Sequence, residues 1–316
     1  MKAPIVKTAY EGKLAAKKRM SDEIWQHRHI YVILLPAVLF YLLFCYLPMF
    51  GTVIAFQKFS VAKGVFKSPF VGLEHFRSFL SDYNFWRLLR NTISISGYGL
   101  LFGFPTPIIF ALLLNELKAK RFKRLVQTVT YMPHFISVVI VASLTLTFVS
   151  NDGVINTIRA MIGVDKVSFM SNPKYFYPVY TVSVIWQNFG WNSIIYLATL
   201  ASVDVELYEA AVIDGANRWK QLLHITLPCI APTIIILLIL QIGNLLSVGF
   251  ERIMLMYNPS VYERADVIST YVYRRGLLNG DYSYSAAVGM FNSIINFILL
   301  IGANSMSKYF SDTSLW

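Results

Sequence analysis

The sequence has 316 residues, of which 56% are hydrophobic, 15% aromatic and only 14% charged, and its formal net charge is +11. This composition fits a soluble globular protein poorly. It does not indicate a nucleic-acid-binding protein either, because the basic residues lie at the ends of apolar stretches instead of forming one face of a folded domain. The composition therefore favours a membrane protein whose surroundings are lipid, with no nucleic acid as a partner.

Six stretches of the sequence contain no Asp, Glu, Lys or Arg. As an α-helix rising about 1.5 Å per residue, each is long enough to cross a hydrocarbon core of roughly 30 Å. We therefore predict an all-α membrane protein with six transmembrane helices. In chain order the stretches are Ile30–Gln57, Asn91–Asn115, Leu125–Asn151, Tyr175–Val203, His224–Phe250 and Tyr282–Ser307.

The distribution of basic residues predicts the orientation in the membrane. Residues 1–28 are rich in Lys and Arg, and so is the short segment Glu116–Arg124 between the second and third stretches. The positive-inside bias places both on the cytoplasmic side. With six spans, both termini and the segment 202–228 then face the cytoplasm.

This topology divides the chain into expected regions. Residues 1–28 form a basic cytoplasmic tail, 29–57 the first transmembrane helix, 58–90 an extracytoplasmic loop, 91–307 the core transmembrane domain with its cytoplasmic loop 202–228, and 308–316 a cytoplasmic tail. Within 58–90, apolar residues alternate with charges in the pattern of an amphipathic helix. Whether that helix lies at the membrane interface or packs on neighbouring loops stays open here. Its apolar positions are Phe76, Phe79, Leu80, Phe85, Leu88 and Leu89.

Proline residues interrupt the second stretch at Pro105 and Pro107. Proline removes a backbone donor from a helix, although neighbours or water in a cavity can satisfy the freed carbonyl groups. The sequence predicts a kink at this point, or a broken helix that lines a pathway.

The predicted spans contain amides and aromatic rings but no acidic residue. Ion-coupled carriers commonly hold an ionisable group at mid-membrane, so this absence argues against ion coupling. Amides and rings together suit an uncharged solute with many hydroxyl groups. They also join helices to one another and anchor spans at the interface, so both interpretations stay open. The fourth stretch holds Gln187, Asn188 and Trp191, and the fifth holds Gln241, Asn244 and Ser247 at a spacing that places them near one face of a helix.

Motifs of common enzymes are missing from the sequence. It contains no GxxxxGK[ST] loop for nucleotide phosphates, no HExxH and no GxSxG. Cys45 and Cys229 are far apart, so neither a CxxC pair nor a zinc cluster is available. We expect a chain that is not an enzyme, holds no metal or cofactor, and does not hydrolyse ATP by itself.

The segment EAAVIDGANRWKQLLHITLP, residues 209–228, separates the fourth and fifth stretches. Ser202 or Asp204 can cap a helix before it, Gly215 can end that helix in a left-handed conformation, and Asn217 can cap a second helix. The sequence therefore predicts a helix, a tight turn and a helix. Its small alanines permit the close approach of another surface.

At this point the residues resemble a known family. Glu209-Ala210-Ala211, Asp214-Gly215-Ala216 and Ile225-Thr226-Leu227-Pro228 resemble the EAA signature of the permease subunits of ATP-binding-cassette (ABC) importers. FVGLEHFRSFL, YMPHFISVV, YSAAVGMFNSIINFILL and the ending DTSLW are similar to the carbohydrate-uptake group, most of all to its polysaccharide or lipoprotein-associated branch. One departure is Leu222-Leu223, where many relatives have Phe or Trp.

The resemblance implies a type I ABC importer permease fold in a prokaryotic plasma (inner) membrane. It implies a second homologous permease subunit, two cytoplasmic ABC ATPase subunits that bind ATP and Mg, and an extracytoplasmic solute-binding lipoprotein. It also implies a coupling helix that sits in a cleft of an ATPase subunit, formed by Glu209, Ala210, Ala211, Asp214, Gly215 and Ala216. By their position relative to the signature, Gln187, Asn188, Trp191, Gln241 and Asn244 resemble the places where maltose-type permeases contact sugar.

We therefore expect the permease subunit of an ATP-driven importer that takes an oligosaccharide from a solute-binding protein into the cytoplasm. Two other functions stay open: a subunit of a membrane sensor complex with the same fold but no net transport, and an ion-coupled carrier that works alone. The sequence also leaves open whether the sugar is neutral or anionic.

Overall fold

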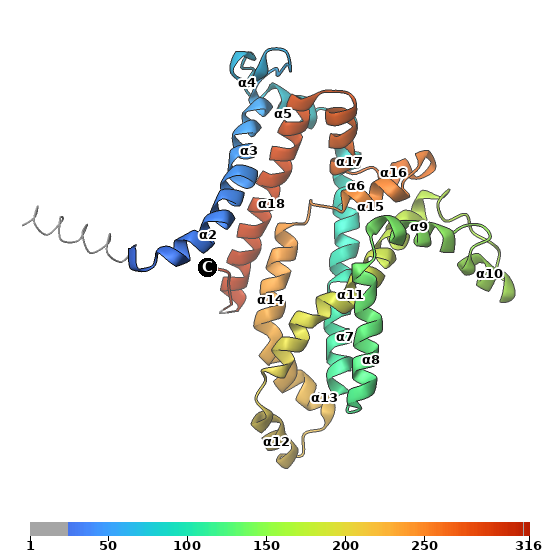
Figure 1. Ribbon diagram of the computed structural model, residues 1–316. Helices are drawn as coiled ribbons and strands as arrows, with labels where there is room; N and C mark the ends of the chain where they lie inside the picture. Colours follow the sequence, from blue (N-terminus) through green and yellow to red (C-terminus); the bar gives the residue numbers. More distant parts are fainter. Residues whose placement is uncertain (1–24, 312) are drawn as a thin grey trace, which may run out of the picture.

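The computed structural model describes residues 25–311 and 313–316, so most of the predicted basic tail lies outside the described residues. Within them the fold is helical, with one isolated antiparallel bridge between Gln57 and Phe70 (Figure 1). This confirms the all-α prediction. The elements are α2 (Arg28–Phe40), η1 (Tyr41–Tyr46), α3 (Leu47–Met49), η2 (Phe50–Phe56), α4 (Gly64–Lys67), α5 (Glu74–Leu80), α6 (Phe85–Tyr98), η3 (Gly99–Gly103), α7 (Pro105–Glu116), α8 (Lys120–Tyr131), η4 (Met132–Phe135), α9 (Val138–Phe148), α10 (Val154–Met161), η5 (Pro173–Tyr175), α11 (Phe176–Ala201), α12 (Val205–Ile213), α13 (Arg218–Gln221), η6 (Leu222–Thr226), α14 (Leu227–Gly243), α15 (Phe250–Met256), η7 (Pro259–Val261), α16 (Tyr262–Ala265), α17 (Ile268–Val272), η8 (Tyr273–Leu278) and α18 (Tyr282–Phe310).

Four continuous helical segments of the described chain are long and apolar enough to cross a membrane: Arg28–Phe56, Phe85–Glu116, Arg218–Gly243 and Tyr282–Tyr309. A bent pair, α8 to η4 with α9, makes a fifth if it counts as one span. The first, second, fifth and sixth predicted spans correspond to the four segments. The fourth, α11, is 26 residues long but is not among them, since amide groups and the aromatic residues Trp and Tyr interrupt its apolar sequence.

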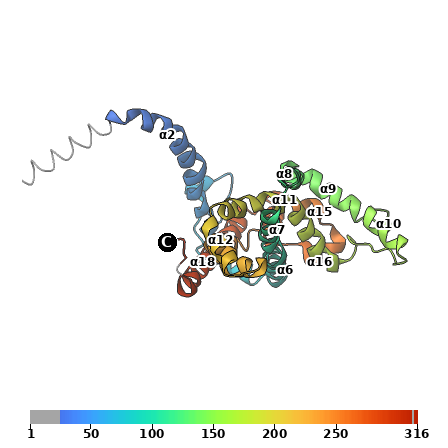
Figure 2. The ribbon, with the colours of Figure 1, turned by 90° about the horizontal axis from the view of Figure 1, so that it is seen from below.

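The first span stands beside the rest of the bundle (Figures 1 and 2), and the residues of its most apolar window are all exposed. Only towards its end, at η2, does it pack closely on α18. In a membrane, the exposed apolar surface of α2 needs lipid or another protein chain against it.

The predicted amphipathic helix of the loop 58–90 is divided in two. Asp82 accepts a hydrogen bond from the backbone N–H of Asn84 at 2.8 Å, in a turn that separates α5 from α6. Phe79 of α5 is buried, and its ring lies 5.1 Å from that of Phe85 and 6.2 Å from that of Tyr284. Helix α5 therefore packs on neighbouring segments through Phe79.

The second span is continuous. A π-helical turn, η3, precedes Pro105, and within it the N–H of Phe104 bonds to the carbonyl of Gly99 at 2.9 Å. Such a turn widens a helix by one residue, which accommodates prolines that supply no N–H. The helix is therefore not broken at the proline-rich stretch.

The third predicted span is not one helix. Helices α8 and α9 meet at an angle of 103°, and Pro133 lies in the η4 turn just before the break. The side chain of Ser137 caps the start of α9. The prediction of a continuous helix over Leu125–Asn151 is therefore wrong, because an apolar sequence does not show where the chain turns.

The fifth predicted span ends early. Helix α14 stops at Gly243, and residues 244–249 are non-helical before α15 begins. The spacing of Gln241, Asn244 and Ser247 predicted that these residues share one helical face. They do not, because the helix ends at Gly243.

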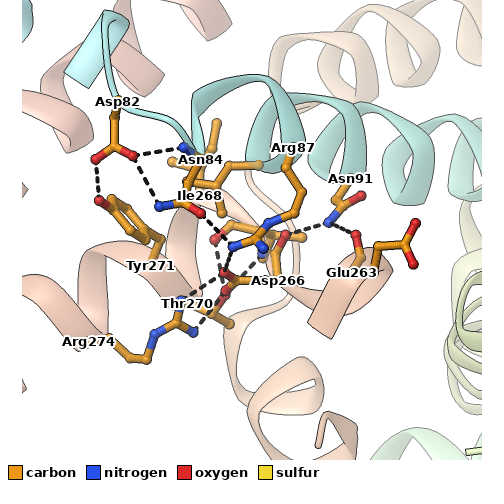
Figure 3. Close-up of polar contacts among 12 residues, drawn as sticks. Asp82, Asn84, Arg87, Asn91, Glu263, Asp266, Ile268, Thr270, Tyr271 and Arg274 are labelled. Atoms are coloured by element: carbon orange, nitrogen blue, oxygen red, sulfur yellow. Dashed lines mark hydrogen bonds and ion pairs between the residues drawn. The ribbon is translucent and has the colours of Figure 1, made fainter. Parts of the chain in front are cut away.

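An ion-pair network holds the loop after α15 against the start of α6 (Figure 3). The Asp266 carboxylate, 1% exposed, accepts two hydrogen bonds from Arg274 at 2.8 and 2.7 Å and lies 3.4 Å from Arg87. Pairing with this carboxylate raises the pKa of the Arg274 guanidinium above its usual value. Asn91 donates to the backbone carbonyls of Asp266 and Glu263 at 2.8 and 2.9 Å. A buried carboxylate with both oxygens bonded fixes this loop on the second span.

Helices α8 and α11 cross at Gly190, where a Cβ atom would lie 2.2 Å from the carbonyl oxygen of Thr130. We predict that Gly190→Ala forces the helices apart and lowers the free energy of unfolding by about 1–3 kcal/mol. Thermal unfolding of the purified protein in detergent measures this. Gly97→Ala is the control, since no atom lies within 4 Å of its added Cβ and it should not destabilise. Equal melting temperatures for the two variants would contradict the tight crossing.

Candidate functional site

A cavity of about 360 Å³ lies between the second span, α11 and α14. Its volume falls within the range of roughly 300–1,000 Å³ usual for ligand pockets. No acidic or basic side chain lines it, and its polar groups are amides and hydroxyls among aromatic and aliphatic neighbours. The amides and hydroxyls of this wall can form hydrogen bonds with the hydroxyl groups of an uncharged solute. The polar lining residues are Tyr180, Thr181, Asn188, Asn192, Tyr196, Gln241 and Asn244.

The structure brings three of the predicted pathway residues to this cavity: Asn188, Gln241 and Asn244. The Gln241 side chain is exposed and has no hydrogen-bond partner among the described residues, so its amide is available to a ligand. Asn192, which belongs to the same polar and aromatic cluster of the sequence but was not among the residues expected to contact sugar, also lines the cavity. Its spacing of four residues from Asn188 places both on one face of α11, which is the signal that identifies it.

Gln187 does not reach the cavity. Its side chain is 5% exposed, its Nε2 donates to the carbonyl of Ile136 at 2.7 Å, and its Oε1 accepts a hydrogen bond from Arg252. Arg252 is itself buried and also donates to Ser183 Oγ at 3.0 Å. Gln187 thus joins α11 to the bend before α9 and to α15.

Trp191 also lies outside the cavity lining. Its ring stacks on His134 with a centroid distance of 4.6 Å and an interplanar angle of 2°. The Nδ1 atom of His134 lies 3.0 Å from Oδ1 of Asn188, so the bend is bonded to a residue of the cavity wall. The polar and aromatic residues of α11 therefore fall into two groups. Gln187 and Trp191 contact the bend before α9, whereas Asn188 and Asn192 line the cavity.

The non-helical residues 244–249 follow α14 at the edge of the cavity. Asn296 of α18 accepts from the N–H of Leu246 at 3.0 Å and donates to Ser247 Oγ at 2.9 Å, and Ser96 of α6 donates to the carbonyl of Leu245. Irregular backbone is tolerated at membrane depth where protein groups satisfy it. These side chains hold the unwound segment beside the cavity.

The loop 202–228 has the predicted local structure. Asp204 caps α12 by accepting from the N–H of Glu206 at 3.0 Å, and Asn217 caps α13 by accepting from the N–H of Lys220 at 2.9 Å. Gly215 has φ +74°, and the N–H after it closes the turn on the carbonyl of Ala211 at 2.8 Å. The helix, tight turn and helix are confirmed.

Helix α12 projects from one end of the bundle (Figure 1) and has no buried residue. Glu209, Ala210, Asp214 and Gly215 are exposed, and Ala211 and Ala216 are partly buried. Around them the loop exposes Val212, Ile213 and Trp219, the last two by 86% and 72%. These large apolar residues are not among the residues predicted for the coupling helix. Exposed apolar patches mark sites of interaction with protein or membrane.

Two contacts tie the loop to the bundle. The hydroxyl of Tyr208 lies 2.9 Å from Thr226 Oγ1, at the base of α14, and Arg218 forms an ion pair with Glu116 at the end of α7. A force on α12 therefore reaches two elements that also border the cavity.

Residues 103–309 match the family described as binding-protein-dependent transport system inner membrane component. The chain is 46% identical to protein LplB of Bacillus subtilis (strain 168) over 91% of both chains. It is 43% identical to the polygalacturonan/rhamnogalacturonan transport system permease protein YteP of the same organism, over 96% of this chain and 95% of the relative. It also resembles a chain in the crystal structure of a bacterial alginate ABC transporter in complex with an alginate pentasaccharide-bound periplasmic protein. There the identity is 43% and the TM-score 0.86, with 94% of this chain and 100% of the other covered.

The different surroundings of Gln187 and Gln241 give a direct test of their roles. We predict that Gln187→Leu lowers the free energy of unfolding by about 1–3 kcal/mol, because it leaves the Arg252 guanidinium and the Ile136 carbonyl buried without this partner. Gln241→Leu, which breaks no hydrogen bond among the described residues, is the matched control and should unfold like the wild type. Thermal unfolding in detergent distinguishes the two variants. An equal loss of stability in both would contradict the different roles of Gln187 and Gln241.

Proposed function

Because the chain belongs to the family of binding-protein-dependent transport system inner membrane components and is the permease of a sugar ABC importer, we propose that it carries an oligosaccharide into the cytoplasm. It is a membrane protein and a transport component rather than an enzyme. The finer assignments below concern its cargo, its topology and its partners.

The observation that carries the proposed cargo is the uncharged cavity between the second span, α11 and α14. Amides such as Asn188, Asn192, Gln241 and Asn244 pair with sugar hydroxyls, and the neighbouring aromatic rings pack against the C–H faces of sugar rings. The relatives named for polygalacturonan and alginate support a saccharide as cargo. A second homologous permease would complete the wall of the pathway.

The proposed topology has six spans, with the bent pair α8 and α9 as the third and α11 as the fourth. Helix α12 lies at the lower end of Figure 1, and α18 runs from the upper end down towards the C-terminus. The basic residues between α7 and α8 lie at the same end. The positive-inside bias makes this end cytoplasmic, and the loops 58–90 and 257–281 extracytoplasmic.

The proposed energy source is ATP bound with Mg by two separate ATPase subunits. Helix α12 would sit in a cleft of one of them, with Glu209 and the apolar residues around it in contact. The contacts of Tyr208 with Thr226 and of Arg218 with Glu116 would pass its displacement to α14 and α7. An extracytoplasmic solute-binding lipoprotein would deliver the oligosaccharide to the opposite end.

We predict ATP-driven uptake by the complete complex in sealed vesicles. With the second permease, the ATPase subunits and the loaded binding protein present, labelled oligosaccharide should accumulate only when ATP is supplied. Dissipating the proton and sodium gradients should leave uptake unchanged. ATP hydrolysis without accumulation would instead indicate a sensor, and uptake that follows an ion gradient would indicate a carrier.

The docking role of α12 gives a second prediction. Glu209→Lys should leave the complex in the membrane but lower saccharide-stimulated ATP hydrolysis and uptake by about tenfold or more, because a reversed charge at an interface costs several kcal/mol. Asp165→Lys makes the same charge reversal on the exposed loop after α10 and should retain both activities. Full activity of the Glu209 variant would remove α12 from the coupling path.

A further inference from the structure

A group of basic side chains lies where α7 ends and α8 begins. Residues 118–124 contain five Lys or Arg and no Asp or Glu. Among the described residues none of the five forms an ion pair, and the nearest carboxylate in the sequence, that of Glu116, is paired with Arg218. The described part of the chain therefore supplies no counter-charge here. The basic patch consists of Lys118, Lys120, Arg121, Lys123 and Arg124.

The basic residues of α8 also repel one another. Lys120 and Arg124 are four residues apart, and Arg121 and Arg124 are three apart, so their side chains are neighbours on the helix surface. No acidic residue stands in the first turn, where the helix dipole disfavours positive charge. Four of the five side chains of the patch are exposed, so an external anion can reach them and relieve the repulsion.

The outer face of α8 carries apolar side chains that continue from the basic patch. Phe122, Leu125 and Val129, with Met132 in the following turn, are each more than half exposed. Their spacing of three, four and three residues places them on one face of the helix. This apolar stripe is roughly 15 Å long, since an α-helix rises about 1.5 Å per residue. Elsewhere α8 packs on α11, which it crosses at Gly190.

A phospholipid has the same division, with a phosphate at one end and apolar chains beyond it. Basic residues at the cytoplasmic end of a membrane helix attract anionic headgroups, and exposed apolar side chains further along the helix contact the acyl chains. An ATPase subunit seated on α12 fits this surface less well. Helix α8 runs away from the end at which α12 projects (Figure 1), so such a subunit would reach the basic patch but leave the apolar stripe uncovered.

We propose that the basic patch and the apolar stripe together bind an anionic phospholipid of the cytoplasmic leaflet. The lysines and arginines hold its phosphate, and an acyl chain lies along Phe122, Leu125 and Val129. The site rests on the proposed function through its topology, which makes this end of the bundle cytoplasmic. It lies outside the saccharide cavity, of which α11 forms one wall, and it adds a ligand that none of the cavity residues binds.

Native mass spectrometry of the assembled importer in detergent tests the site, because it counts the lipid molecules bound to each complex. The probes are phosphatidylglycerol and phosphatidylcholine with identical acyl chains. The wild type should bind its first phosphatidylglycerol molecule about tenfold more tightly than phosphatidylcholine. The combined variant Lys120→Gln, Arg121→Gln and Arg124→Gln should remove this preference.

The matched control removes three exposed lysines outside the patch. The combined variant Lys58→Gln, Lys63→Gln and Lys67→Gln loses the same number of charges and should keep the preference for phosphatidylglycerol. Leu125→Ser combined with Val129→Ser keeps every charge but removes apolar contacts with the acyl chain, so it should weaken phosphatidylglycerol binding by about tenfold. Glycerophosphoglycerol, the same headgroup without acyl chains, should not displace the lipid at equal concentration.

The lipid site is wrong if the wild type binds both phospholipids equally, or if either the charge variant or the apolar variant binds phosphatidylglycerol like the wild type. Competition by glycerophosphoglycerol would show a site for soluble anions instead. Loss of the ATPase subunits from the charge variant, with lipid binding unchanged, would assign the patch to the ATPase and also overturn the proposal.

ATP-driven uptake of labelled oligosaccharide, measured on the same preparations, separates the two proposals. Uptake that persists beside a failed lipid titration overturns the lipid site alone. The absence of uptake beside normal lipid binding overturns the importer function alone.

Discussion

A chain inside a bilayer can leave the helix only where other protein groups take over its backbone hydrogen bonds. Two breaks in this structure meet that condition: Gln187 bonds the carbonyl of Ile136 beside the bend before α9, and Asn296 and Ser96 bond the unwound residues after α14. Both breaks adjoin the cavity, one through Asn188 and the other through Asn244. The cavity thus lies where helices are interrupted, and the interruptions depend on a few polar side chains.

Features set by neighbouring residues were predictable from the sequence, and features set by distant ones were not. The caps at Asp204 and Asn217 and the turn at Gly215 involve partners within five residues. The last two were predicted correctly, and Asp204 is one of the two caps that the sequence offered. The partners of Gln187 lie 51 and 65 residues away, so the sequence could not separate this structural amide from those that line the cavity. The absence of charged residues likewise did not reveal the end of α14, because the unwound residues 244–249 carry no charge either.

One helix connects the proposed docking loop to the cavity. Helix α14 begins just after Thr226, which contacts Tyr208 of α12, and ends at Gly243, beside the unwound segment. Gln241 and Asn244 stand at its far end. In the proposed coupling, a displacement of α12 would have a continuous path through α14 to the cavity wall and the unwound segment beside it.

The central claim is that saccharide passes along the wall formed by Asn192, Gln241 and Asn244. The direct measurement is thiol labelling of Asn244→Cys in the assembled importer after replacement of Cys45 and Cys229. The transported saccharide should slow the labelling of this position during ATP-driven transport and leave that of Trp191→Cys unchanged, since Trp191 lies outside the cavity. Labelling of Asn244→Cys at the same rate with and without saccharide would contradict the account.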